Sequence, residues 1–233
     1  MSDHAPAPPS ASPPALPSET GVWVIVVAAG RGSRFRGDTP KQYLPLGEAR
    51  VLDASLAAAS AVADGVVLVV GADYLDQAEP GATTVVQGGA TRSDSVRRGL
   101  AAVPDDAEVV LIHDAARPLA RRSVFDAVIA AIRSGADAAI PAIPVIDTIK
   151  RVDGDRVVET LVRDELVAVQ TPQGFNAAAL RRAHASGAEA TDDAALIEAA
   201  GGTAVVVPGD PTNIKITLPS DFALAEIWAA PPS

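Results

Sequence analysis

The stretch "VIVVAAGRGSRFRGDTPKQYLPLGE", residues 24–48, joins an apolar run to a glycine-rich loop. The loop carries four cations within eleven residues, namely Arg31, Arg34, Arg36 and Lys41. In an open parallel sheet, ligands bind at the carboxyl ends of the strands, where the chain turns into loops. Glycine lets backbone N–H groups approach an anion closely, and Arg and Lys add charge. We therefore expect an anion site at the end of this first strand.

Apolar runs like the first one recur downstream and predict the fold class. They lie at 66–71, 83–87 and 109–114. Helix-like segments lie between most of them; Val96 and Leu100, for example, are spaced as on one face of a helix. Runs that are apolar on both faces suit parallel strands covered by helices on each side. The alternation predicts an α/β fold with a doubly wound, mostly parallel sheet.

The middle of the chain departs from this alternation. Residues 140–175 are rich in proline and β-branched residues, and "DGD" at 153–155 is a turn signal. The pattern predicts a hairpin or extended arm, residues 143–169, in place of another helix. An isolated two-stranded ribbon is marginal in water. The arm could therefore fold back on the sheet or pack against a second copy of the chain, and we expect the second use.

The α/β pattern resumes after residue 175. We expect helices near 176–186 and 191–200, strands at 204–208 and 214–217, and a last helix at 219–229. Thr191 is the expected N-cap of the second of these helices, and Gly201 its stop. The folded part is expected to be a single domain, residues 21–230. A proline- and alanine-rich tail, residues 1–20, is expected to be disordered.

Composition excludes several classes of function. The 233-residue chain has a formal charge of −10, so its surface as a whole repels nucleic acid and anionic membranes. It has no cysteine, which excludes disulfides, thiolate nucleophiles and cysteine-ligated metal sites. The first twenty residues lack the basic start and apolar middle of a secretion signal, and no later run is long enough to span a bilayer. We expect a cytoplasmic protein with no nucleic-acid or membrane partner.

The glycine loop does not match two familiar phosphate-binding motifs. A P-loop requires Lys-Ser or Lys-Thr after its last glycine, whereas Gly32 is followed by Ser33 and Arg34. The dinucleotide motif G-x-G-x-x-G begins at Gly30 and Gly32 but places Phe35 where the third glycine belongs. Spacing alone leaves open that the four cations only solvate a surface turn. A nucleophilic triad has no support, because the G-x-S-x-G motif is absent.

Eight short motifs together carry a resemblance to a known family. In chain order they are "AAGRGSRF" (28–35), "PKQYLPLGE" (40–48), "GGATRSDSVRRGL" (88–100), "HDAARPL" (113–119), "DTIKR" (147–151), "TPQGF" (171–175), "TDD" (191–193) and "NIKIT" (213–217). From about residue 22 to 229 the chain resembles the 2-C-methyl-D-erythritol 4-phosphate cytidylyltransferase family. The resemblance implies a Rossmann-like sheet with a protruding β-arm that clasps a second subunit, hence a homodimer. It also implies that CTP, with Mg²⁺, reacts with methylerythritol phosphate to give the CDP-alcohol and pyrophosphate.

The resemblance also assigns roles to residues. Catalytic roles in holding the triphosphate fall to Arg34 and Lys41. Nucleotide contacts are implied for Ala28, Ala29, Gly30, Gly32, Gly89, Ala90, Ser95, Asp114 and Arg117, with Asp114 also on the metal. Acceptor contacts are implied for Thr148, Arg163, Thr171, Thr191 and Lys215. Some relatives carry an acidic residue where Ala90 stands, so a base contact there must come from the main chain.

Plainer roles remain open for several of these residues taken singly. Ser95 could be a helix-start residue and Thr191 a helix cap. Arg117 could simply pair with Asp114. His113 is expected to be a packed neighbour instead of a metal ligand, because no second histidine lies near it in the sequence.

Other functions remain open for the chain as a whole. The nearest rival is a ribitol 5-phosphate cytidylyltransferase, which shares nearly every nucleotide motif and differs in the arm and the acceptor residues. A non-catalytic module that senses CTP is a more remote alternative, because a sensor has no need of both Arg34 and Lys41. A glycosyltransferase-like sheet would require a D-x-D metal motif at a strand end, and none is found there.

Overall fold

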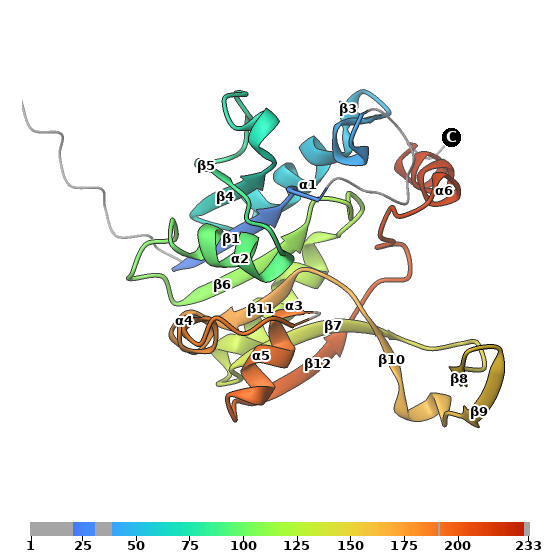
Figure 1. Cartoon of the computed structure of the whole chain (residues 1–233). Coiled ribbons are helices and arrows are strands. Elements are labelled where there is room, and N and C mark those ends of the chain that lie inside the picture. Colours follow the sequence, from blue (N-terminus) through green and yellow to red (C-terminus); the bar gives the residue numbers. More distant parts are fainter. Residues whose placement is uncertain (1–20, 31–38, 191, 231–233) are drawn as a thin grey trace, which may run out of the picture.

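The computed structural model describes residues 21–30, 39–190 and 192–230 (Figure 1). Its strands are β1 (Val22–Val27), β2 (Pro45–Leu46), β3 (Ala49–Arg50), β4 (Gly65–Val70), β5 (Thr84–Gln87), β6 (Val109–Asp114), β7 (Ala138–Pro144), β8 (Lys150–Asp153), β9 (Arg156–Thr160), β10 (Val167–Val169), β11 (Gln173–Asn176) and β12 (Ala204–Pro208). Its α-helices are α1 (Val51–Ser60), α2 (Arg92–Leu100), α3 (Arg122–Arg133), α4 (Ala177–Ala185), α5 (Asp193–Ala199) and α6 (Pro219–Ala229). Short 3-10 turns lie at Lys41–Tyr43, Ala72–Tyr74 and Arg163–Glu165. No helix in the described ranges is long and apolar enough to cross a membrane.

One central sheet organises the molecule. Its strand order is β10-β7-β11-β6-β1-β4-β5, and β12 pairs with β7. β1 runs parallel to both β4 and β6, so that Val24 lies opposite Val66 on one side and Leu111 on the other. β11 interrupts the parallel order, because it lies antiparallel between β6 and β7. The predicted mostly parallel sheet is confirmed, and the four strands predicted at 22–29, 66–71, 83–87 and 109–114 form as expected, as β1, β4, the edge strand β5 and β6.

Helices cover the sheet on both faces (Figure 1). Val24 and Val26 of β1 lie on one face, in a cluster that includes Leu56 of α1 and Phe125 of α3. Ile25 lies between them and belongs to the cluster on the other face, with residues of α2, α4 and α5. Successive side chains of a strand point to opposite faces, so β1 is buried from both sides. This two-sided burial is the physical reason for the uninterrupted apolar run in the sequence, and it confirms the doubly wound architecture.

Helix α2 brings the segment after β5 back onto the sheet. Thr91 caps its N-terminus by accepting a hydrogen bond from the Asp94 N–H at 3.1 Å. Val96 is buried, as its helical spacing predicts. Gly99 lies so close to β1 that a β-carbon there would come within 2.7 Å of Ile25. This close contact holds α2 against the centre of the sheet.

The strand expected at 214–217 is wrong. The Ile216 N–H donates to the Ala116 carbonyl at 2.9 Å, and the Ile214 N–H donates to the Thr212 carbonyl at 2.8 Å. Backbone groups used in this way are not available for a strand ladder. The segment instead crosses the carboxyl edge of the sheet, beside the loop that follows β6. Its apolar pattern reflects Ile216, which is fully buried in a small cluster of its own.

Helix α5 starts later than the sequence predicts. Its N-cap is Asp192, whose carboxylate accepts a hydrogen bond from the Ala195 N–H at 3.1 Å. The predicted cap, Thr191, lies outside the described residues. Asp is as good an N-cap as Thr, so a run of Thr-Asp-Asp does not by itself fix the first turn. The predicted stop is confirmed, because the helix ends at Ala199 and Gly201 follows with a φ of +80°.

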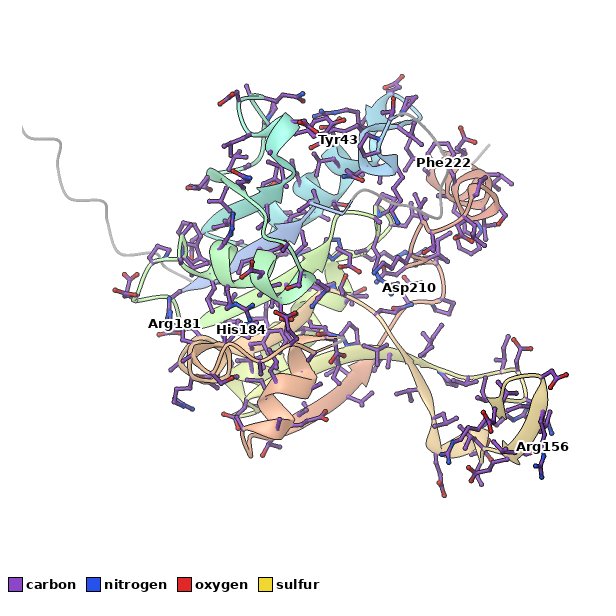
Figure 2. All side chains as sticks on the ribbon, in the orientation of Figure 1. Tyr43, Arg156, Arg181, His184, Asp210 and Phe222 are labelled. Atoms are coloured by element: carbon purple, nitrogen blue, oxygen red, sulfur yellow. The ribbon has the colours of Figure 1, made fainter. Side chains whose placement is uncertain are left out.

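The predicted arm protrudes from the sheet at the lower right of Figure 1. β7 and β10 pair at its base, and β8 and β9 form an antiparallel hairpin farther out. Gly154 makes the hairpin turn with a φ of +60°, and Arg156 lies near the far end (Figure 2). The arm exposes a series of large aliphatic side chains: Ile146, Val152, Val157, Val158, Val162, Val167 and Val169. An apolar surface of this extent is unusual in a monomeric soluble domain.

Candidate active site

A cavity of about 570 Å³ opens at the carboxyl edge of β1 and β6. Five segments line it: the residues at and after the end of β1, the turn at Lys41, the start of α2 with the loop before it, the end of β6, and the chain around Lys215. These segments are far apart in sequence. They meet because the carboxyl ends of neighbouring parallel strands lie at one edge of the sheet.

Gln42 fixes the segment that follows β1. Its side-chain amide donates to the carbonyl of Ala28 at 2.7 Å and to the carbonyl of Gly30 at 3.3 Å. The Ala28 N–H in turn donates to the Val69 carbonyl at 2.7 Å. Gln42 is buried, so breaking these contacts would leave polar groups without partners. The two ends of the glycine loop are thereby held together.

Packing and ion-pair contacts of neighbouring residues hold the short turn that carries Lys41. Tyr43 stacks on Tyr74, with the ring centroids 4.1 Å apart. The guanidinium of Arg50 lies 5.9 Å from the centre of the Tyr43 ring and pairs with the buried Glu79 at 2.6 Å. Burial, together with the charge of Glu79, raises the pKa of Tyr43 above its ordinary range. These contacts fix the backbone from which the Lys41 side chain extends.

Two lysines reach the cavity from opposite ends of the chain. The ammonium of Lys41 donates to the carbonyl of Ile216. The ammonium of Lys215 pairs with Asp114 Oδ2 at 2.6 Å. Both lysines line the cavity. The segment at 213–217, which is not a strand, therefore serves to bring a second cation to the site and to orient the first.

Asp114 is an ionised carboxylate at neutral pH. Burial alone would raise its pKa, but the charges of Lys215, Arg92 and Arg117 outweigh this effect and hold the pKa below its usual value. Asp114 ends β6 and lines the cavity. The site thus contains one negative group surrounded by cations.

The loop between β5 and α2 presents main-chain atoms to the cavity. The hydroxyl of Ser95 accepts from the Gly89 N–H at 3.0 Å and donates to the Thr91 carbonyl at 2.9 Å. A β-carbon at Gly88 would come within 2.4 Å of Ala29. The loop therefore lies directly on the end of β1. Because Thr91 is the N-cap, Ser95 is not needed as the helix-start residue, and its hydroxyl shapes the loop.

Arg117 lies outside the lining of the cavity. Its guanidinium donates to the Asn213 carbonyl at 2.7 Å and to the Val169 carbonyl at 3.3 Å. No ion pair between Arg117 and Asp114 is found among the described residues, although its charge helps to keep Asp114 ionised. Burial lowers the pKa of the guanidinium below its ordinary value. Its role in nucleotide binding stays a prediction.

Thr171 lies beneath the site and bonds to both residues at the end of β6. Its hydroxyl accepts from the Asp114 N–H at 3.0 Å and lies 3.1 Å from His113 Nδ1. A hydroxyl can donate one hydrogen bond and accept two, so the contact fits either neutral tautomer of His113. His113 is fully buried, as expected of a packed neighbour, and its ring lies 5.4 Å from that of Phe125.

The buried His113 predicts acid sensitivity. Burial lowers its pKa to about 4, so between about pH 6.5 and 4 the unfolded chain binds a proton that the folded chain does not. Stability must therefore fall as the pH falls through this window, by up to roughly 3 kcal/mol. We expect His113→Gln to lose stability at pH 7 but to show a shallower decline toward pH 4. Urea unfolding at pH 7, 5.5 and 4 measures this, and parallel declines for the two proteins would contradict it.

The cavity brings together most of the residues that the resemblance singles out. Those that line it are Ala28, Ala29, Gly30, Lys41, Gly89, Ala90, Ser95, Asp114 and Lys215. Three others, Gly32, Arg34 and Thr191, lie outside the described residues. Thr148 and Arg163 lie in the arm, away from this cavity, and Arg163 donates to the Ile146 carbonyl at 2.8 Å.

Six of the residues that line the cavity were not predicted from the sequence, and two of them, Gln42 and Arg92, have long polar side chains. Gln42 follows Lys41 directly, and Arg92 lies within the "GGATRSDS" motif. Both lie inside motifs that carry the family resemblance, and this position was a signal that they could lie at the site. Their roles depend on partners that are distant in the sequence, and no local pattern reveals those.

The described part of the site fits a divalent cation that is shared with a ligand. Asp114 is the only carboxylate among the described residues that line the cavity. Those described residues contain no cluster of three or more histidine or acidic groups that could hold a metal alone. A magnesium-like ion needs no such cluster, because it commonly binds through one or two carboxylates, water and the phosphates of a substrate.

Comparison with known proteins agrees with this geometry. The family model described as 2-C-methyl-D-erythritol 4-phosphate cytidylyltransferase matches residues 22–230. The chain belongs to this family. The match covers every described segment that lines the cavity. The family is one of nucleotidyltransferases, for which a divalent metal is general.

Members of the cytidylyltransferase family are similar over most of the chain. A relative of that name from Frankia casuarinae is 46% identical over 216 residues, covering 90% of this chain and 81% of the relative. A bifunctional enzyme IspD/IspF from Solidesulfovibrio magneticus is 43% identical, and the match spans 91% of this chain but 58% of that longer protein. The crystal structure of the Thermus thermophilus cytidylyltransferase aligns with a TM-score of 0.77 at 35% identity, covering 88% of this chain and 97% of the other.

Proposed function

We propose that this protein transfers CMP from CTP to 2-C-methyl-D-erythritol 4-phosphate, giving 4-diphosphocytidyl-2-C-methyl-D-erythritol and pyrophosphate. The observation that carries the proposal is the convergence of Lys41 and Lys215 with Asp114 on one cavity, in a chain that matches this family from residue 22 to 230. The family match does not favour the ribitol 5-phosphate alternative. A nucleotide sensor would not need the second cation.

The chemistry explains why the site consists of cations. A phosphate oxygen of the acceptor attacks the α-phosphorus of CTP, a new P–O bond forms, and the bond to pyrophosphate breaks with its electron pair leaving on pyrophosphate. The acceptor phosphate has a second pKa near ~6 and is largely dianionic at neutral pH. No protein base is needed to remove a proton. Catalysis of such a transfer consists mainly of positioning and of neutralising charge.

We propose distinct tasks for the described residues. Lys41, held beside the end of the glycine loop, neutralises the triphosphate. Main-chain atoms at Gly89 and Ala90 face the cytosine, for which a purine would be too large. The predicted partner of Lys41 in this task, Arg34, belongs to the same glycine loop and remains a proposal.

We assign the divalent metal to Asp114, and Mg²⁺ is the proposed ion. Lys215 contacts Oδ2 of this carboxylate, and the carboxylate has two oxygen atoms. The bound ion would neutralise phosphate oxygens of the nucleotide. Lys215 is proposed to bind the acceptor phosphate. Thr171 holds the backbone of Asp114 in place by accepting a hydrogen bond from its N–H.

A direct assay tests the proposed function. Pyrophosphate release is measured with CTP and Mg²⁺, and with methylerythritol phosphate or ribitol 5-phosphate as the acceptor. We expect release with the first acceptor and little with the second. A preference for ribitol 5-phosphate would overturn the substrate, and binding of CTP without release under any condition would favour the sensor. A cytoplasmic location stays a prediction from the sequence.

The arm is proposed to join two copies of the chain into a homodimer. Seven of the thirteen large hydrophobic residues exposed in the described structure lie on residues 143–169. Exposed strand edges and apolar surfaces of this kind are commonly buried against another protein surface. Dimerisation would also carry Thr148 and Arg163, which lie away from the cavity of their own chain, toward that of the partner.

A charge on the arm should weaken the dimer. Ile146 is 81% exposed, so Ile146→Asp costs the single chain little, but it would bury a charge in a dimer interface. We expect the dimer dissociation constant to rise by at least about tenfold. Ile227→Asp on α6, where Ile227 is 69% exposed, is the matched control. Sedimentation equilibrium measures both, and an unchanged Ile146→Asp dimer would rule out the arm.

A further inference from the structure

Arg92 is a cavity cation to which the family motifs assign no role. It is the first residue of α2, and its side chain is 28% exposed. Lys41, Arg92 and Lys215 are the three cations among the described residues that line the cavity. A cation in such a place either holds the fold together or contacts the ligand, and the surroundings of Arg92 distinguish the two.

A buried carboxylate aims Arg92. Arg92 Nη1 pairs with Asp193 Oδ2 at 2.7 Å, and His184 Nε2 lies 3.1 Å from Asp193 Oδ1. Asp193 and His184 are both buried, between α4 and α5; Figure 2 shows His184 on α4, below α2. The carboxylate is thus satisfied from both sides. Arg92 cannot turn away without leaving a buried charge unpaired.

The same guanidinium also acts on Asp114. Burial opposes the charge of Arg92, but Asp193 and Asp114 outweigh it and raise the pKa of the guanidinium. Lys215 contacts the same Asp114 directly. Arg92, Lys215 and Asp114 also line the same cavity, so the two cations act on one carboxylate there. Lys41 extends from the turn after the glycine loop, and its ammonium donates to the carbonyl of Ile216, next to Lys215.

Arg92 retains hydrogen-bond donors for a ligand. An arginine has five N–H donors, and Nη1 is the only guanidinium nitrogen of Arg92 with a hydrogen-bond partner among the described residues. A planar fork of donors suits a phosphate, which it can bind through two oxygens. Lys215 is already paired with Asp114, so a second cation beside it would help to neutralise a dianionic acceptor phosphate.

We propose that Arg92 binds the phosphate of the acceptor alcohol together with Lys215, and that Asp193 is the positioning residue that aims it. The inference rests on the proposed function. It joins the nucleotide-reading helix α2 to helix α5, so that placing the acceptor depends on the contact between the two helices. His184 holds Asp193 from the side opposite Arg92.

Arg92→Lys tests the role of Arg92. Lysine keeps the charge but cannot bind Asp193 and a phosphate with one planar fork, so we expect kcat/KM for methylerythritol phosphate to fall at least about tenfold, chiefly through KM. The dissociation constant for CTP, measured by calorimetric titration with Mg²⁺, should change by less than about twofold. An equal loss of CTP affinity would overturn the inference, because Arg92 would then bind the nucleotide.

Asp193→Asn tests the positioning. As a single substitution, Asp193→Asn should raise the KM for the acceptor. Combined with Arg92→Lys, it should raise that KM little further, because the arginine that Asp193 orients is already absent. Independent effects of the two substitutions would overturn the positioning role. Circular dichroism and CTP binding, measured for each variant, show whether that variant is folded.

Arg97 on the same helix provides a matched control. It pairs with Glu189 at 2.8 Å and also donates to the Ala188 carbonyl, so it too joins α2 to the region before α5, but it does not line the cavity. Arg97→Lys should leave the acceptor KM within about twofold of the original value. If Arg92→Lys behaves like Arg97→Lys, the Arg92–Asp193 pair is only structural and the inference fails. Absence of turnover by the unchanged chain would instead overturn the proposed function, and this inference with it.

Discussion

Lys41→Ala is expected to lower kcat by about 10²- to 10³-fold, while the chain stays folded. The magnitude is that of removing one preorganised donor from a developing negative charge, about 3 to 4 kcal/mol. The fold should persist because Tyr43 and Gln42, the neighbours of Lys41, anchor the turn independently of the lysine. The hydrogen bond to the Ile216 carbonyl that is lost contributes little to stability.

Single-turnover pyrophosphate release and urea unfolding, measured on the same preparation, check this expectation. Arg122→Ala is the control, because it also removes one positive charge, from an exposed pair with Asp126 on α3. The control should keep both activity and stability. Turnover by Lys41→Ala near that of the unchanged chain would remove Lys41 from the mechanism.

Asp114→Asn is expected to lower activity by at least about 100-fold, as losing a group on which metal binding depends commonly does. Asparagine keeps the shape of the side chain and leaves the backbone bond to Thr171 in place. It removes the negative charge that pairs with Lys215 and that is proposed to attract the metal. When pyrophosphate release is titrated with Mg²⁺, the Asp114→Asn variant should need a higher Mg²⁺ concentration for half-maximal activity.

Lys215→Met separates the two possible tasks of Asp114. If Asp114 serves only to hold Lys215, the two variants will show the same defect, confined to the acceptor, and the same Mg²⁺ dependence. If Asp114 binds the metal, only Asp114→Asn will shift the Mg²⁺ titration. Asp126→Asn, on the exposed surface of α3, controls for the loss of a carboxylate.

The parts of the fold that follow from local pattern were predictable. β1, β4 and β6 are apolar on both faces because helices cover the sheet on both faces, so each of these short runs is continuously apolar. The segment at 214–217 misled because Ile214 and Ile216 imitate the alternation of a strand. The carbonyl of Ala116, which accepts from the Ile216 N–H, lies about a hundred residues away in the sequence and fixes the true course of the segment.

The candidate site divides in the same way. The glycines and cations after the first strand predicted an anion site that includes Lys41, since strand ends are where such sheets bind ligands. The role of Asp114 was implied by the family resemblance. Arg92 and Gln42 could not be assigned roles in advance. The role of Arg92 depends on Asp193, and that of Gln42 on the carbonyls of Ala28 and Gly30, so each is defined only once the chain has folded.

The three cavity cations are each tied to the protein itself: Lys41 to a carbonyl, Arg92 to a buried carboxylate and Lys215 to Asp114. Like charges repel, and work is needed to gather them around a small volume. Here that work is done once, while the chain folds, and does not recur in every catalytic cycle. The substrate therefore binds to cations that are already oriented, and little of its binding energy is used to bring them together.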